Sequence, residues 1–164
     1  MNPDEKFEAF KRNLIGSEPG RMAVAAHLRT VFPIVEVPPL RVAPNRELAR
    51  LYKDHGDIWT QLEDGRRFRV EVRHLKGTQF TCAEDWPYGW RNFMIGQTYL
   101  HDQADPEPDY YVMVSRDLRY GARLWVKKDR PNWRIERRFN RLQGEEQLDY
   151  MTTLDNVKFF ELRR

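Results

Sequence analysis

Two carboxylates and one guanidinium stand in a segment whose pattern predicts a β-hairpin. Asp57 opens a run that alternates apolar and polar residues, and a second alternating run carries Glu71 and Arg73. The loop between the runs has three residues and ends in Gly65, which is typical of a type I turn followed by a left-handed residue. Counting back along that register places Asp57 opposite Glu71, with their Cβ atoms roughly 5 Å apart. Arg73 lies two residues further on and should project from the same face.

Such a pair of acids suggests a site for a divalent cation. Two carboxylates this close repel each other unless a cation or a proton lies between them, and hard divalent metals favour oxygen ligands. A structural alternative stays open, in which Asp57 follows Gly56 in a turn and Glu71 pairs with Arg69 or Arg73 on a solvated sheet face. A loop of two residues would also undo the pairing, because a slip of one residue moves one acid to the opposite face.

The composition bounds the kind of protein. A chain of 164 residues, 40% of them hydrophobic and 13% aromatic, is expected to form a single domain over residues 1–164 with a real core. No apolar run approaches the roughly 20 residues that span a bilayer, and the N-terminal residues lack the apolar centre of a signal peptide. Cys82 is the only cysteine, which excludes an internal disulfide and a thiolate zinc cluster and fits a reducing cytoplasm.

Positive charge is concentrated in one part of the chain. The formal net charge is +3, but residues 116–141 contain ten Lys or Arg against three acids. This asymmetry is typical of a surface that faces phosphates, with an ordinary solvated face as the alternative. The residues expected to contact nucleic acid are Lys127, Lys128, Arg130, Arg134, Arg137, Arg138 and Arg141.

The elements that must position these residues follow from hydrophobic periodicity. Helices are predicted over residues 4–15, 18 to about 32 and about 45–53. Besides the hairpin, strands are predicted over residues 35–40, 93–100, 110–115 and 122–127, while 133–142 fits either a helix or a strand. The aromatic loop at 86–90 is expected to pin itself to the body with its rings, with stacking on nucleobases as the alternative.

A helix, a strand, and then Asp and Glu-x-basic on neighbouring strands is the order of elements in the PD-(D/E)xK nuclease superfamily. The stretch from Gly56-Asp57-Ile58 to Val70-Glu71-Val72-Arg73-His74 resembles the core signature of that family, with a 13-residue spacer. The resemblance covers roughly residues 18 to 76. The tracts at 74–76 and 84–88 are also similar to small members carried by phages and mobile elements. The resemblance implies an α/β fold of the restriction-endonuclease type, with a central mixed sheet flanked by helices.

The resemblance also implies roles for individual residues. Asp57 and Glu71 match the two acids that hold Mg²⁺ or Mn²⁺. Glu18 is the candidate for the acid that the first helix contributes, although the usual place of that acid could fall at Arg21. Arg73 stands where the family has Lys; an arginine can bind the scissile phosphate but does not give up its proton near neutral pH. Lys76 is the candidate to take over the lysine role.

The function implied is metal-dependent hydrolysis of phosphodiester bonds in DNA, with RNA left open as a substrate. The alternative is a catalytically silent protein that keeps the scaffold and binds nucleic acid or a protein partner, since fold does not determine function. No membrane partner is expected, and a homodimer is left open.

Overall fold

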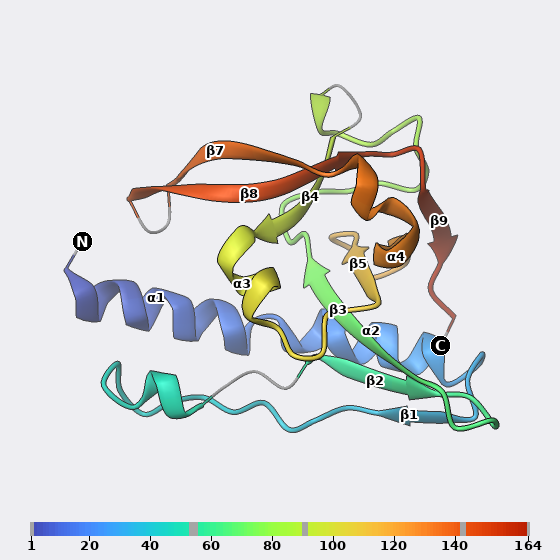
Figure 1. Ribbon diagram of the computed structural model, residues 1–164, viewed down its shortest axis with the longest axis horizontal. Coiled ribbons are helices and arrows are strands. Elements are labelled where there is room, and N and C mark those ends of the chain that lie inside the picture. Colours follow the sequence, from blue (N-terminus) through green and yellow to red (C-terminus); the bar gives the residue numbers. More distant parts are fainter. Residues whose placement is uncertain (1, 53–55, 90–91, 142–143, 164) are drawn as a thin grey trace.

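Two β-sheets and a set of helices make up the computed structural model, which describes residues 2–52, 56–89, 92–141 and 144–163 (Figure 1). The larger sheet is mixed, and its strands run in the order β1 (Ile34–Glu36), β2 (Ile58–Gln61), β3 (Arg67–His74), β5 (Tyr110–Val114), β6 (Tyr120–Trp125) and β9 (Val157–Glu161). The smaller sheet is antiparallel, in the order β4 (Asn92–Gln97), β8 (Glu145–Thr153) and β7 (Arg134–Asn140). The α-helices are α1 (Pro3–Ile15), α2 (Glu18–Leu28), α3 (Thr98–Gln103) and α4 (Val126–Asp129), and the 3₁₀ turns are η1 (Ala49–Leu51) and η3 (Arg130–Asn132).

The β2–β3 hairpin of the larger sheet forms in the predicted register. The Leu62 N–H donates to the Arg66 carbonyl at 2.9 Å, and Gly65 takes the left-handed conformation with φ of 87°. Strands β2 and β3 pair antiparallel with Ile58 opposite Val70. Strand β3 then pairs in parallel with β5, and this is what makes the sheet mixed.

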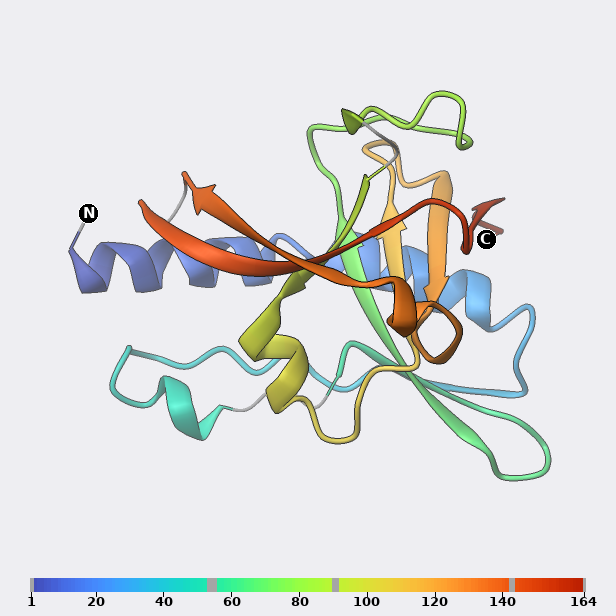
Figure 2. The same cartoon turned by 45° about the horizontal axis from the view of Figure 1, so that its top comes forward.

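The core lies on both faces of the larger sheet. On one face, α2 buries Val24 and Ala25 against strand residues that include Val70 and Val112. The other face packs against the smaller sheet and the loop after β3 through a second apolar cluster, which contains Phe80, Trp86, Phe93, Ile95, Met113, Ala122, Leu124 and Leu154. Figure 2 shows the long β7–β8 ribbon, in orange and red, crossing over the strands of the larger sheet. The outward polar face predicted for the hairpin is therefore partly covered by a second sheet.

The two N-terminal helices form as predicted, although the second ends earlier. Helix α1 begins at a capping box, in which the Asn2 side chain accepts from the Glu5 N–H and the Glu5 side chain accepts from the Asn2 N–H. Helix α2 starts with Glu18 and Pro19 and ends at Leu28, four residues short of the predicted end.

Several predictions of secondary structure are wrong or incomplete. The strand expected over 35–40 is only Ile34–Glu36, and the one expected over 122–127 ends at Trp125. In the described part of the helix expected over 45–53, residues 45–52, only the short turn η1 forms, because the apolar residues Leu48 and Leu51 stay exposed and provide no buried stripe. Residue 53 lies outside the described residues. The strand expected over 93–100 stops at Gln97, where α3 begins. The ambiguous stretch 133–142 contains strand β7. The α/β class with a mixed sheet is confirmed, whereas the separate three-stranded sheet is not part of the prediction. None of the helices described is both long and apolar enough to cross a membrane.

Candidate active site

The pairing of β2 with β3 places the two predicted acids opposite each other, just before the first residue of β2. The β2–β3 register, continued one step beyond the Ile58–Val70 pair, places Asp57 opposite Glu71. One carboxylate oxygen of Asp57, Oδ2, accepts the backbone N–H of Val72 at 2.7 Å. The Asp57 side chain thus reaches the neighbouring strand where β2 stops pairing, and the hairpin holds it beside Glu71.

Glu71 forms an ion pair with Arg69, which is one of the two pairings expected if Glu71 has a structural role only. The Arg69 Nε donates to Glu71 Oε1 at 2.6 Å, and the two side chains are only 5% and 15% exposed. Arg69 is anchored further through Nη1, which donates to the Pro106 carbonyl at 3.2 Å. One of the two acids of the candidate site is therefore already paired with a buried arginine side chain.

Arg73 lies where the acids converge, between the two sheets. Burial of its guanidinium lowers the pKa of Arg73, while the charges of Tyr111, Asp149, Asp57 and Glu71 raise it, in that order. Room for the guanidinium is left by Gly96 on β4: a Cβ at this position would lie 2.7 Å from Arg73 Nη2.

Asp149 on β8 is an acid of this site that the sequence analysis missed. Its side chain is fully buried, and both of its oxygens accept from Gln147 Nε2, at 2.7 and 2.9 Å. Gln97 Nε2 in turn donates to Gln147 Oε1 at 2.6 Å. Arg138 Nη1 lies 3.8 Å from Asp149 Oδ2. The smaller sheet thus supplies a third negative charge close to Arg73, and only the packing of the two sheets reveals it.

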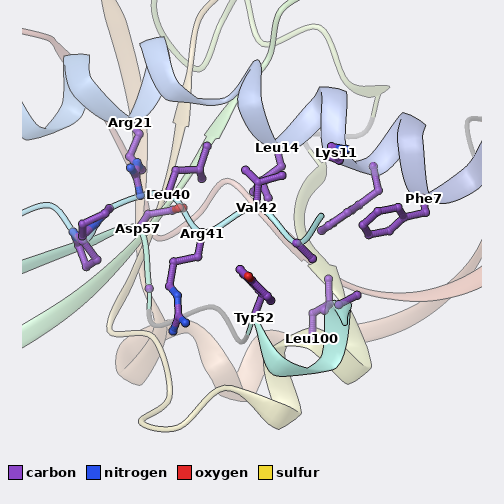
Figure 3. Close-up of a pocket in the computed structure, with 16 residues that line it drawn as sticks. Phe7, Lys11, Leu14, Arg21, Leu40, Arg41, Val42, Tyr52, Asp57 and Leu100 are labelled. Carbon is purple, nitrogen blue, oxygen red and sulfur yellow. The ribbon is translucent and has the colours of Figure 1, made fainter. Parts of the chain in front are cut away.

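On helix α2, Arg21 points toward Asp57 (Figure 3). Arg21 is nearly buried and lines the same cavity as Asp57, and it forms an ion pair with Glu18 at 2.9 Å. Glu18 is thus paired with a guanidinium that itself points toward Asp57. The role of Glu18 as a third acid stays a prediction.

The cavity that ends at Asp57 has a volume of about 340 Å³. Its wall is mainly apolar and comes from α1, from residues 38–43 and from the neighbouring Tyr52 and Leu100 (Figure 3). Asp57 and Arg21 place opposite charges at one end of this apolar space.

Lys76 lies at the junction of the two N-terminal helices. Its Nζ is packed against Gly16, directly after the C-terminal end of α1. His74, two residues before Lys76, packs its Cβ against Gly20 of α2. Both side chains therefore face the helices, whereas Arg73 faces the smaller sheet. The proposal that Lys76 replaces the family lysine is not supported by this placement.

The seven basic residues predicted to bind nucleic acid do not share one face. Lys127, Lys128, Arg130, Arg137 and Arg141 are exposed to solvent. Arg134 and Arg138 turn toward β4 instead: Arg134 donates to the Asn92 side chain and Arg138, which stays partly exposed, donates to the Met94 sulfur. The reason is that residues 134–140 form a strand, in which successive side chains point to opposite faces.

The aromatic loop is pinned by Trp86. The Trp86 indole stacks on Phe93 with a centroid distance of 5.8 Å, and its Nε1 donates to the Asn92 carbonyl at 2.8 Å. Tyr88 keeps 43% of its surface exposed, and Trp90 falls outside the described residues. The preferred interpretation of this loop is confirmed for Trp86.

The carboxylates of Asp57 and Glu71 suit Mg²⁺ better than a cation that takes all of its ligands from the protein. Among the described residues there is no group of three or more His, Cys, Asp or Glu side chains arranged to hold a metal. Mg²⁺, however, commonly takes one or two carboxylates, keeps several waters and completes its shell with substrate phosphates.

Comparisons of the chain with protein-family models, with curated proteins and with solved structures gave no match.

Proposed function

We propose that this protein is a metal-dependent nuclease that hydrolyses phosphodiester bonds in DNA. The observation that carries the proposal is the convergence of Asp57, Glu71 and Arg73: adjacent strands present the two acids opposite each other, and the charge of each acid acts on the guanidinium. The order of α2, β1 and the β2–β3 hairpin also agrees with the resemblance to the PD-(D/E)xK superfamily.

Each residue has a role that its surroundings support. Asp57 is oriented by the Val72 N–H, and Glu71 by Arg69, so neither carboxylate has to be ordered when the cation arrives. A bound Mg²⁺ or Mn²⁺ would polarise the phosphate and lower the pKa of an attacking water. Arg73 binds the scissile phosphate and stabilises the charge that develops on it in the transition state. The exposed basic residues of α4, η3 and β7 attract the nucleic-acid backbone.

A second candidate function is nucleic-acid binding without cleavage. It is favoured by the buried ion pair of Arg69 with Glu71, and by the position of Arg21 near Asp57. Resident guanidinium groups already offset part of the negative charge that would otherwise attract a divalent cation.

The test is DNA cleavage in the presence of Mn²⁺ by the wild-type chain and by Asp57→Asn. The asparagine keeps an oxygen that can accept the Val72 N–H but removes the charge, so the fold should survive while cleavage is lost. Asp64→Asn is the matched control, because Asp64 is an acid in the exposed hairpin loop. Arg73→Gln should slow cleavage by roughly 100-fold, and Arg73→Lys should raise the rate.

Equal cleavage by the wild type and by Asp57→Asn would overturn the proposed site. DNA that is bound with strong salt dependence but never cut, with Mn²⁺ present, would support the second candidate instead.

A further inference from the structure

A second cavity, of about 310 Å³, lies between the two sheets beneath the aromatic loop. Its wall combines aromatic rings, thioethers and guanidinium groups, including those of Trp86, Tyr88, Met94, Met151, Arg73 and Arg138. Arg73 therefore borders this cavity as well as the candidate active site. We propose that the cavity receives one unpaired nucleobase, so that the substrate is single-stranded DNA or an unpaired DNA end; the inference rests on the proposed function for the role of Arg73.

The walls suit the two faces of a nucleobase. Trp86 is fixed by its stacking on Phe93 and its hydrogen bond to Asn92, so it forms a rigid side of the cavity. Tyr88 meets Trp86 edge-on at 5.3 Å and remains 43% exposed, so its ring can cover a base that enters. Stacking of a base on such rings is tolerant of sequence, because every base has a π-face. The methionine side chains add polarizable surface of adaptable shape.

Polar groups at the rim suit the edge of a base. Arg138 contacts the Met94 sulfur, and 45% of its side chain is exposed. Its guanidinium can therefore turn to donate hydrogen bonds to ring nitrogens and carbonyl oxygens, which is the usual way in which arginine recognises bases. Glu136, held by Arg134 at 2.9 Å, offers an acceptor on the same wall.

The position of Arg73 links the cavity to the acids. A phosphate bound to Arg73 would lie next to Asp57 and Glu71, and the attached base could enter the cavity. A paired base in a duplex cannot do this, because its edge is held by the opposite strand and its faces by its neighbours. The cavity therefore favours an unpaired base.

The experiment measures binding without metal, in EDTA, so that it does not depend on cleavage. The probes are short fluorescein-labelled single strands of DNA and RNA and a duplex of the same DNA sequence. The wild-type chain should bind the single strands more tightly than the duplex. Tyr88→Ala and Arg138→Gln should each raise the Kd for the single strands by roughly ten-fold, the size expected for one stacked base.

Matched controls come from residues outside the cavity. Arg137→Gln removes the same charge from the opposite face of β7 and measures the loss that charge alone produces; Tyr99→Ala removes an exposed ring on α3. If Arg138→Gln and Arg137→Gln weaken binding equally, or if the wild type prefers the duplex, the inference is overturned. If single strands are bound through Tyr88 and Arg138 but are not cut with Mn²⁺, base binding in the cavity is supported and the proposed nuclease activity is contradicted.

Discussion

The side chains around Arg73 show how one guanidinium can be held between two sheets. Asp57 and Glu71 come from the larger sheet and Asp149 from the smaller one, and all three act on the same cation. The close approach depends on Gly96, whose φ of 144° and missing Cβ leave space for the Arg73 side chain. A residue with no chemistry of its own thus helps to position the group that we propose binds phosphate.

Gly96→Ala should therefore reduce stability and displace Arg73. A φ of 144° is strained for any residue with a Cβ, at a cost of about 1–3 kcal/mol. The flexible end of Arg73 can move away from the new methyl group, so the proposed nuclease activity should fall as well. Urea unfolding measures the first effect, with Gly89→Ala as the control, because its added Cβ meets no atom within 4 Å. Equal stability of both variants would contradict this account of Gly96.

Helix α2 covers the face of the larger sheet opposite the smaller sheet, and it packs closely on β3. The approach is close at Gly20, where an added Cβ would lie 2.7 Å from His74 Cβ. Gly20 lies in a helix and His74 in a strand, and the backbone hydrogen bonds of each element hold it in place. A shift of either residue would therefore cost free energy. The same helix places Arg21 near Asp57, so the spacing of α2 from the sheet also controls the charge beside the candidate acid.

Gly20→Ala tests which of two opposing effects is larger. Alanine is the better helix former, by about 1 kcal/mol. Overpacking a tight contact costs about 1–3 kcal/mol, and here the contact is between two Cβ positions on rigid elements. We expect net destabilisation in thermal unfolding, while Gly77→Ala, where a Cβ meets no atom within 4 Å, should change little. A more stable Gly20→Ala variant would show that α2 is free to shift away from β3.

The whole molecule is held together partly by a buried polar cluster around His101. The His101 ring contacts the Tyr111 hydroxyl at 2.7 Å and the Glu107 carboxylate at 2.9 Å, and it meets the rings of Trp133 and Tyr150 edge-on. This cluster joins α3 to both sheets. Burial lowers the pKa of His101 from its usual 6.5, and the charge of Arg130 lowers it further. His27 has a lowered pKa as well, again mainly because of burial.

These shifts predict that the protein loses stability in mild acid. A folded-state pKa below 6.5 means that the unfolded chain binds the proton more readily. The neutral, buried histidines thus contribute fully to the free energy of unfolding above pH 6.5. This contribution declines as the pH falls toward their folded-state pKa. The measurement is the unfolding free energy across this range for the wild type and for His101→Gln, in which the decline should be smaller. An unchanged decline would show that His101 is not the group responsible.

What could be predicted from the sequence was mostly local. The hairpin register followed from period-two alternation and from one glycine in a three-residue loop, so the residue types alone were enough to pair Asp57 with Glu71. Helix α1 could be predicted for a similar reason, since the spacing of its apolar residues is a property of one short segment. These signals are short-range, and distant parts of the chain do not alter them.

The tertiary structure decided everything that depends on distant segments meeting. It formed the smaller sheet, brought Asp149 and Gly96 to Arg73, turned Arg134 and Arg138 toward β4, and put Arg21 where the family resemblance led us to look for an acid. No local pattern encodes such contacts, because whether a polar residue on a strand faces water or another sheet depends on what packs against it.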